Sequence, residues 1–218
     1  MPAGDLVLMG APGSGKGTQA RLLADRHGWV QLATGDLFRD HGRRGTTLGK
    51  LADGYMTKGQ YVPDEVTVAM VRERLGEITV GTRVVFDGFP RTVAQAISLD
   101  GLLGERGRAV GAVVLIEVGR DELLVRLGGR ATCSDCQAVY SLAARPPARA
   151  GRCDRCGGPV VATARPDDSP EVVRKRLALY EEQTRSVVEH YAGRGLLRPI
   201  DGVGAIEEVA DRVAVALR

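Results

Sequence analysis

Five short apolar runs are separated along the chain by longer stretches in which apolar residues recur at helical spacing. The runs are rich in Val, Leu and Ile and are bounded mainly by Gly, Asp or Thr. Runs of this kind are typical of strands that are buried on both faces of a parallel sheet. The sequence therefore predicts five strands, at residues 6–10, 29–33, 83–86, 112–118 and 196–200.

Four helices follow from the spacing of apolar residues between and after these runs. Residues 18–27 show helical spacing and stop before Gly28, a residue that commonly terminates helices. Asp64 can cap a second helix, Ser169 and Pro170 begin a long third one, and a fourth closes the sequence. The apolar faces of these last three helices hold Val68, Val71 and Leu75; Val173, Leu177, Tyr180, Thr184, Val187 and Tyr191; and Ile206, Val209, Val213 and Leu217.

Strands that alternate with helices predict an α/β fold with a doubly wound parallel sheet of five strands. Two stretches depart from the alternation. Residues 34–63 hold glycines and short helical pieces but no convincing strand, and residues 128–166 are rich in Arg, Pro and Gly and contain every cysteine. Both are interpreted as insertions at the edge of the sheet, and such insertions often carry function.

Composition limits the possible partners. The 218 residues suffice for one core with insertions, and the formal net charge of +3 is too small to indicate a nucleic-acid or membrane partner. The first residues lack the basic character of a signal peptide, and the longest apolar stretch, 109–118, is too short to span a membrane. We therefore expect a cytoplasmic protein that binds neither nucleic acid nor membranes.

A phosphate-binding loop is predicted between the first strand and the first helix. Residues 10–16, GAPGSGK, fit the pattern G-x-x-x-x-G-K, in which backbone N–H groups surround phosphate oxygens and Lys16 reaches the terminal phosphates. Gly17 follows the lysine where a Ser or Thr usually supplies a hydroxyl to Mg²⁺. Asp87, at the end of an apolar strand, is the candidate to hold that ion, directly or through water.

The four cysteines form two C-x-x-C pairs with 16 residues between the pairs, Cys133 with Cys136 and Cys153 with Cys156. Such pairs can place four thiolates around Zn²⁺ and leave no coordination place for water, which predicts a structural zinc site. Two disulfides are the simpler alternative. A zinc ribbon that binds nucleic acid is another, because several arginines surround the cysteines, although Tyr140 offers the only aromatic ring nearby.

Several stretches in this order resemble those of adenylate kinases of the bacterial type with a long, zinc-containing lid. They are GAPGSGKGTQ at 10–19, TGDLFR at 34–39, DGFPRT at 87–92, RPDD at 165–168 and VRKRL at 173–177. The resemblance runs almost from end to end. It implies a P-loop core of residues 1–32, 64–128 and 167–218, an AMP-binding insert at 33–63 and a zinc-containing lid at 129–166.

The resemblance also implies a role for particular residues. The ATP-binding positions would be Gly13, Ser14, Gly15, Lys16, Gly17, Thr18, Arg126, Arg130 and Tyr140. The AMP-binding positions would be Thr34, Gly35, Arg39, Tyr61, Val62, Gly88, Arg91, Gln95, Arg165 and Arg176. The catalytic positions would be Lys16, Arg91, Arg130, Arg165 and Arg176, with Asp87 for Mg²⁺ and with Asp167 and Asp168 orienting the arginines.

The activity so implied is the reversible transfer of a phosphoryl group from Mg-ATP to AMP, giving two ADP, by a monomer. Three positions depart from many relatives. Ala131 stands where a second lid arginine is common, and Ser141 where a His follows Tyr140. Tyr61 occupies a position beside the AMP base that is usually aliphatic. The first alternative is therefore a kinase that uses GTP as donor or another monophosphate as acceptor. The second, of a different class, is a nucleic-acid-binding zinc module.

Overall fold

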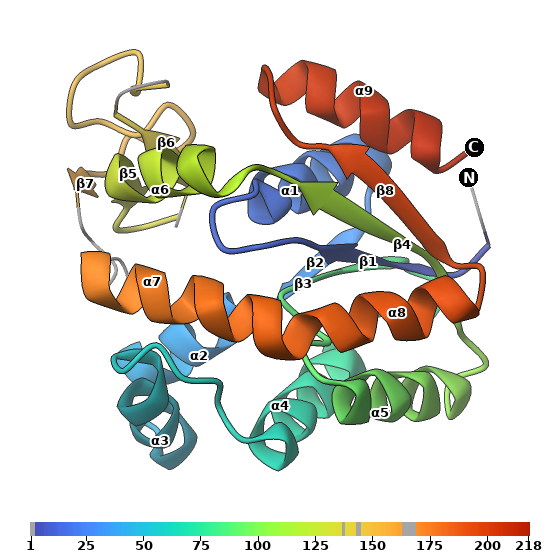
Figure 1. The fold of residues 1–218 in the computed structure, drawn as a ribbon. Helices are drawn as coiled ribbons and strands as arrows, with labels where there is room; N and C mark the ends of the chain where they lie inside the picture. The colour runs from blue at the N-terminus through green and yellow to red at the C-terminus, as the bar shows by residue number, and fades with distance from the viewer. Residues whose placement is uncertain (1–2, 137, 143–144, 163–168) are drawn as a thin grey trace.

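Five parallel strands form the centre of the molecule, in the order β2-β3-β1-β4-β8 (Figure 1). The computed structural model describes residues 3–136, 138–142, 145–162 and 169–218. The strands are β1 (Asp5–Met9), β2 (Val30–Ala33), β3 (Val84–Asp87), β4 (Val110–Glu117) and β8 (Leu197–Asp201). The predicted fold class and all five predicted strands are thereby confirmed, with ends within two residues of those expected.

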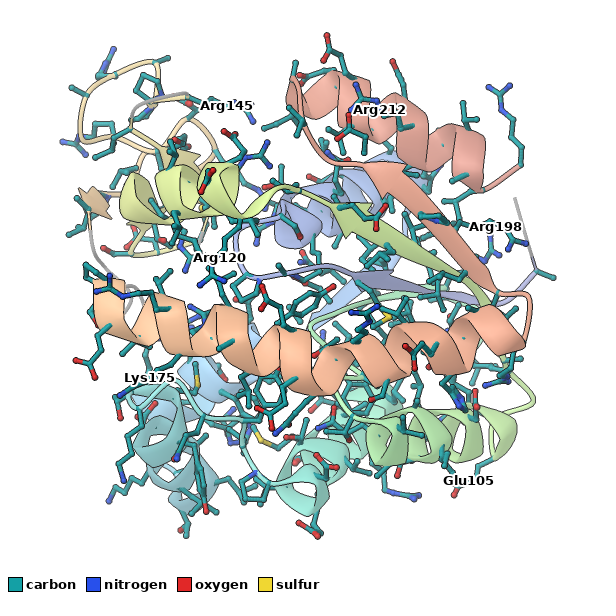
Figure 2. The ribbon with its side chains drawn as sticks, in the orientation of Figure 1. Glu105, Arg120, Arg145, Lys175, Arg198 and Arg212 are labelled. Carbon is teal, nitrogen blue, oxygen red and sulfur yellow. The ribbon has the colours of Figure 1, made fainter. Side chains whose placement is uncertain are left out.

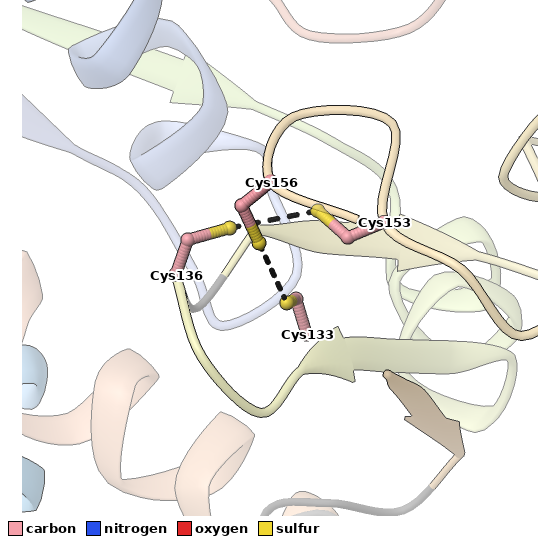
Figure 3. A group of neighbouring side chains, drawn as sticks. All are labelled: Cys133, Cys136, Cys153 and Cys156. Carbon is pink, nitrogen blue, oxygen red and sulfur yellow. Dashed lines mark hydrogen bonds between the residues drawn. The ribbon is translucent and has the colours of Figure 1, made fainter. Parts of the chain in front are cut away.

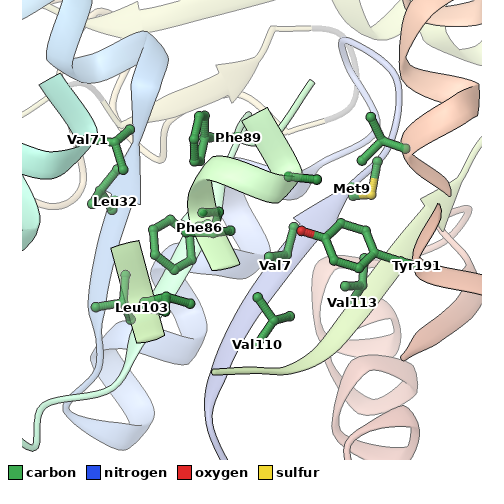
Figure 4. Packing of buried hydrophobic residues seen from close by; sticks show 14 of the residues in the cluster. Val7, Met9, Leu32, Val71, Phe86, Phe89, Leu103, Val110, Val113 and Tyr191 are labelled. Carbon is green, nitrogen blue, oxygen red and sulfur yellow. The ribbon is translucent and has the colours of Figure 1, made fainter. Parts of the chain in front are cut away.

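Helices cover both faces of this sheet. Successive side chains of the central strand point to opposite sides, so both faces carry apolar side chains that need to be covered. Val7 and Met9 of β1 pack into one core cluster with Phe86 (Figure 4), whereas Leu6 and Leu8 pack into a second cluster on the other face. The first face is covered by α4 (Asp64–Glu77), α5 (Val93–Gly104) and α8 (Arg185–Gly193). The second face is covered by α1 (Lys16–His27) and α9 (Ile206–Ala216).

The first insertion is helical, as predicted. Helices α2 (Thr34–Arg43) and α3 (Thr47–Met56) lie between β2 and α4, and the described chain contains no strand from 34 to 63. Phe38 and Ala52 pack there with Val62 and Met70 in a small cluster of their own. This cluster gives the insertion a core separate from the two that flank the sheet.

The second insertion contains an antiparallel sheet that the sequence did not predict. Helix α6 (Arg120–Gly128) leads into β5 (Arg130–Cys133), which pairs on either side with β6 (Val139–Ser141) and β7 (Val160–Ala162). These strands have three or four residues, too few for a recognisable pattern. We call this part, residues 129–166 as far as it is described, the lid.

The long helix predicted from Ser169 onward contains an irregular turn. It consists of α7 (Pro170–Leu179), a π-helical turn (Tyr180–Thr184) and α8, and the Ser169 hydroxyl caps it by accepting from the backbone N–H of Val172 at 3.4 Å. The predicted cap of α4 was wrong. Asp64 is the first residue of that helix, Pro63 is the cap, and the Asp64 carboxylate binds side chains of α5 and its cap instead.

Many charged side chains lie on the outside of the molecule, although Asp5 is buried. Figure 2 labels six of them, and all except the half-buried Arg212 are exposed: Glu105, Arg120, Arg145, Lys175, Arg198 and Arg212. Within the described ranges, every helix is too short or too polar to cross a membrane.

Candidate functional site

The turn between β1 and α1 forms a tight glycine-rich loop. Gly10, Gly13 and Gly15 adopt positive φ angles of 147°, 87° and 100°, a region that other residues enter only with strain. Gly15 is the N-cap of α1. The free N–H groups at the start of that helix, together with its dipole, favour an anion at this place.

Lys16 is the first residue of α1 and turns back toward the loop. Its Nζ donates to the carbonyl oxygens of Gly10 at 2.7 Å and Ala11 at 2.9 Å. Burial lowers the pKa of Lys16 to about 8, and Asp87 acts in the opposite direction by favouring the ammonium. Three arginines add to the lowering of this pKa: Arg91, Arg176 and Arg130. Three arginines from three other segments are therefore close enough to Lys16 to act on its charge.

Asp87 ends β3 beside this loop. A Cβ atom placed on Gly17 would lie 3.1 Å from Asp87 Oδ2, so a residue with a side chain there would press on the carboxylate. Gln31 Nε2 lies 3.5 Å from the same oxygen and 3.4 Å from the carbonyl oxygen of Gly17. A carboxylate oxygen is a ligand that Mg²⁺ accepts, and it lies where phosphate oxygens on the loop could share the ion. The donor set fits Mg²⁺.

A cleft opens between the first insertion and the sheet. Nine of its lining residues are predicted AMP-binding positions: Thr34, Gly35, Arg39, Tyr61, Val62, Gly88, Arg91, Gln95 and Arg176. The remaining lining residues are Phe38, Met56, Gly59, Gln60 and Thr67, which the sequence did not single out. The tenth predicted position, Arg165, lies outside the described residues, as do Asp167 and Asp168.

Arg39 lies over the first turn of its own helix. A Cβ atom on Gly35 would approach both terminal nitrogens of Arg39 to 3.2 Å, so the glycine leaves room for the guanidinium. Asp36 forms an ion pair with one of these nitrogens. In the part of the chain that the structure describes, Arg39 Nε is buried without a hydrogen-bond partner. Such a donor in a cleft fits an anionic ligand.

Arg91 is held on the opposite wall of the cleft. Its Nε donates to the carbonyl oxygen of Gly88 at 2.8 Å, and Thr34 Oγ1 donates to the same oxygen at 2.9 Å. The guanidinium carbon of Arg91 lies 4.9 Å from the centre of the Tyr61 ring, a cation–π arrangement. The Tyr61 hydroxyl lies 3.0 Å from Thr184 Oγ1, in the π-helical turn. Segments more than a hundred residues apart thus meet at this arginine.

The four cysteines of the lid gather around one point (Figure 3). Their sulfur atoms all lie within 4.8 Å of one another, and two pairs, Cys133 with Cys156 and Cys136 with Cys153, are 3.5 Å apart. All four are free thiols, which argues against the disulfide alternative. Sulfur atoms at ~2.3 Å from a central zinc ion stand about 3.8 Å apart in a tetrahedron, so this arrangement fits zinc.

The acid–base properties of the four cysteines also fit a bound cation. Burial raises the pKa of the Cys136 thiol to about 12. Burial opposes ionisation of Cys153 too, but hydrogen bonds from the Tyr140 hydroxyl and from backbone amides lower its pKa to about 6. Neighbouring thiolates repel, so they cannot all ionise unless a metal ion offsets their charge.

Three predicted ATP-binding residues lie at or in the lid. Arg126 Nε donates to Glu122 Oε1 at 2.8 Å, and its Nη2 donates to the carbonyl oxygen of Gly202 at 3.1 Å. Arg130 begins β5. Tyr140 is buried inside the lid, where its hydroxyl donates to Cys153 Sγ at 3.3 Å, so its polar group serves the cysteine cluster.

Besides those five lining residues, the sequence did not reveal two residues that hold lining side chains in place. Asp64 binds Gln95, and Thr184 binds Tyr61. The sequence pattern predicts a helix cap for Asp64 and an apolar helix face for Thr184. Only the hydroxyl of Thr184 on an otherwise apolar face was a signal, and it is a weak one.

Comparison with known proteins agrees with this geometry. The family model described as "Adenylate kinase" matches residues 8–196. A protein named adenylate kinase from Moorella thermoacetica is 49% identical over 97% of both chains. Another, from Acidothermus cellulolyticus, is 47% identical over 98% of this chain and 97% of its own. A third, from Symbiobacterium thermophilum, is 46% identical over 98% of both. The chain belongs to the adenylate kinase family.

Proposed function

We propose that this protein catalyses the reversible transfer of a phosphoryl group from ATP to AMP, giving two ADP. The observation that carries the proposal is that the glycine-rich loop and the arginine-lined cleft adjoin at the end of β3: Gly17 faces Asp87, and Gly88 lines the cleft with Arg91. Two nucleotides placed end to end concentrate negative charge where the loop and the cleft meet. Cations from several segments are what such a transfer requires.

The donor would lie on the loop. Residues 13–18 would surround its phosphates with backbone N–H groups, and Lys16 would exchange its two carbonyl partners for phosphate oxygens. Arg126, Arg130 and Tyr140 are the proposed donor contacts from the lid side. The Tyr140 contact would come from its ring edge, because its hydroxyl is engaged with Cys153.

The acceptor would lie in the cleft. Arg39 and Arg91 would bind the phosphate of AMP, which gives the buried Arg39 Nε an anionic partner. Gln95, with Thr34 nearby, would face the base. The remaining proposed AMP contacts are Gly35, Tyr61, Val62, Gly88, Arg165 and Arg176.

The reaction needs no covalent intermediate on the protein. An AMP phosphate oxygen forms a bond to the terminal phosphorus of ATP as the bond from that phosphorus to the bridging oxygen breaks, which leaves ADP on both sides. Arg91, Arg130, Arg165 and Arg176 would stabilise the charge that spreads over the transferred group, and Asp167 and Asp168 would orient them. The two insertions, 33–63 and 129–166, would close over the nucleotides and exclude water.

Two metal ions belong to the proposal. Asp87 would hold Mg²⁺, which neutralises phosphate charge when bound. The four cysteines would hold Zn²⁺ and give the lid its shape, without a part in the reaction. Reduced thiols that serve as ligands fit a cytoplasmic location, and we propose a monomer whose partners are ATP, AMP and ADP.

A donor-by-acceptor activity matrix tests the proposal. Purified protein with Mg²⁺ is assayed for every pair of ATP or GTP with AMP, GMP, CMP or UMP, and product diphosphates are quantified. The proposal expects ATP with AMP to give the highest kcat/KM. A higher value for GTP, or for another monophosphate, would assign the alternative nucleotide kinase. Absence of turnover with every pair would overturn the proposal.

A further inference from the structure

The amide of Gln95 is held at both ends by partners within the protein. Its Nε2 donates to Asp64 Oδ1 at 2.7 Å, and its Oε1 accepts from the backbone N–H of Arg91 at 2.8 Å. Thr92 Oγ1 donates to the other oxygen of Asp64 at 2.7 Å. Gln95 itself is 2% exposed and lines the cleft. These four groups form one continuous chain of hydrogen bonds at the cleft wall.

The polarity of this chain leaves one orientation for the amide. A carboxylate only accepts hydrogen bonds, so the Gln95 group that faces Asp64 must be the NH₂. A backbone N–H only donates, so the group that faces Arg91 must be the oxygen. Rotating the amide by half a turn would set two oxygens against each other at Asp64 and two donors against each other at Arg91. Each mismatch leaves a buried polar group unsatisfied, which is strongly unfavourable.

Each end of the amide keeps one hydrogen-bonding place. Nε2 has a second N–H and Oε1 has a second lone pair. An amide of fixed orientation therefore offers a donor and an acceptor in fixed order to a base in the cleft. Adenine presents a 6-amino donor beside the N1 acceptor and matches that order. Hypoxanthine and guanine present a 6-oxo acceptor beside an N1–H donor, and match only the rotated amide.

We infer that Asp64 is a positioning residue that fixes the orientation of Gln95, and that it thereby makes the acceptor site selective for 6-amino over 6-oxo purine monophosphates. This inference rests on the proposed function, because it takes Gln95 to face the base. Asp64 does not need to touch the nucleotide. It acts through the Gln95 amide, which would read the base.

Inosine monophosphate (IMP) is the probe, because it differs from AMP only at the edge that Gln95 would read. Asp64→Asn is the test variant. Asparagine has the shape of aspartate and can face Gln95 with either an oxygen or an NH₂. One of the two contacts that fix the orientation of the Gln95 amide therefore no longer does so. Glu65→Gln is the matched control, because Glu65 is the other carboxylate in the first turn of α4 and is exposed. Both variants lose one negative charge at the same helix end.

We expect Asp64→Asn to raise the ratio of kcat/KM for IMP to that for AMP by about tenfold or more, as the loss of one mismatched buried contact would. The KM for ATP should stay within about threefold of wild type, and Glu65→Gln should leave the IMP-to-AMP ratio unchanged. Equilibrium titration with AMP and with IMP, without ATP, should show the same change in relative affinity. This second measurement does not depend on turnover.

Three other results would count against the inference or against the proposed function. Equal losses for AMP and IMP in Asp64→Asn, with the ratio unchanged, would overturn the inference and make Asp64 a structural residue. Wild-type protein that uses AMP and IMP equally would also overturn it and would leave the proposed kinase activity intact. Wild-type protein without activity on AMP would instead remove the proposed function.

Discussion

Arg91 is positioned by contacts within the protein at every part of the residue. Its backbone N–H binds Gln95, its Nε binds the Gly88 carbonyl, and its guanidinium lies against the ring of Tyr61. An arginine stabilises a transferring phosphoryl group only if it is already in place, because reorganisation during the reaction would consume the benefit. Gly88, at φ 73°, leaves the room that this arrangement needs.

Arg91→Ala is expected to lower kcat about a hundredfold or more, as loss of a preorganised charge partner does. The protein should still fold, because Arg91 is only half-buried and its hydrogen bonds are to the cleft wall. Steady-state kinetics with circular dichroism measures both. Arg72→Ala is the control, since Arg72 is exposed and pairs with exposed Glu105, and it should keep normal turnover. A folded Arg91→Ala with near-normal kcat would remove Arg91 from the mechanism.

The pKa of Lys16, about 8, predicts how nucleotide binding depends on pH. Above pH 8 the free protein carries a neutral Lys16, whereas bound phosphates favour the ammonium and raise its pKa. ATP binding should then take up a proton, and affinity should fall by as much as about tenfold per pH unit above 8. Calorimetric titration at pH 9, in buffers of different ionisation enthalpy, counts the proton.

Lys16→Arg supplies the comparison for this prediction, because its guanidinium stays charged throughout the range. Its affinity for ATP, whatever the absolute value, should not fall between pH 7.5 and 9. Proton uptake by the variant equal to that of wild type would assign the titration to another group.

At the scale of elements, most regular patterns were predicted, but two regular helices, α5 and α6, and the irregular elements were not. The five strands and the helix that ends at Gly28 follow from apolar runs and a glycine stop, and Gly28 does adopt a left-handed conformation. The π-helical turn at Tyr180–Thr184 was missed because apolar residues keep a helical spacing through it. The short lid strands were missed because three or four residues are too few to show an alternation of apolar and polar side chains.

The π-helical turn leads to a prediction about the AMP site. Thr184 Oγ1 lies 3.0 Å from the Tyr61 hydroxyl and donates to the carbonyl oxygen of Arg91 at 3.4 Å, so this turn helps to hold Tyr61 and Arg91. Thr184→Val and Tyr61→Phe should each raise the KM for AMP about threefold to tenfold, with a smaller change in the KM for ATP. Their double variant should be little worse than Thr184→Val, because both remove the same bond.

Tyr61→Leu should weaken AMP binding more than Tyr61→Phe, since it also removes the ring beneath Arg91. Tyr55→Phe, in the same insertion, provides a hydroxyl-loss control with unchanged kinetics. Additive effects of Thr184→Val and Tyr61→Phe would show that the two side chains act independently.

For the whole molecule, the sequence was sufficient for the architecture of the main sheet and, through the resemblance to adenylate kinases, for most cleft residues. It was insufficient for contacts between segments. Asp64 and Gln95 are 31 residues apart, and their bond depends on how α4 packs on α5. The lid likewise meets α1 through Arg21, which donates to the carbonyl oxygen of Cys136 at 3.3 Å, and through Arg155, 3.7 Å from Asp25. No local pattern encodes such pairs.

We expect loss of zinc to destabilise the lid, because the contacts described between the lid and α1 are few. Metal analysis should find about one zinc per chain, and removing it, or changing Cys133 and Cys153 to Ser, should lower the Tm by about 5 °C or more. Turnover well below that Tm should remain measurable, because Lys16, Asp87 and Arg91 belong to the sheet side of the molecule. Zinc returned to the stripped wild type should restore the Tm. Complete loss of activity in protein whose lid is still folded would contradict a purely structural ion.

The strand order has a consequence for how the protein is made. β1 leaves the ribosome first, yet it lies in the middle of the sheet, between β3 and β4. Leu6 pairs in register with Val85 and Ala112, so this largely apolar strand has no neighbour until β3 has been synthesised, and it lacks its second neighbour until about half of the chain exists. Nascent segments of this kind are where chaperones bind and aggregation starts. Truncated translation products that end before residue 110 should therefore be the species that engage holding chaperones, whereas those that end beyond β4 should release them.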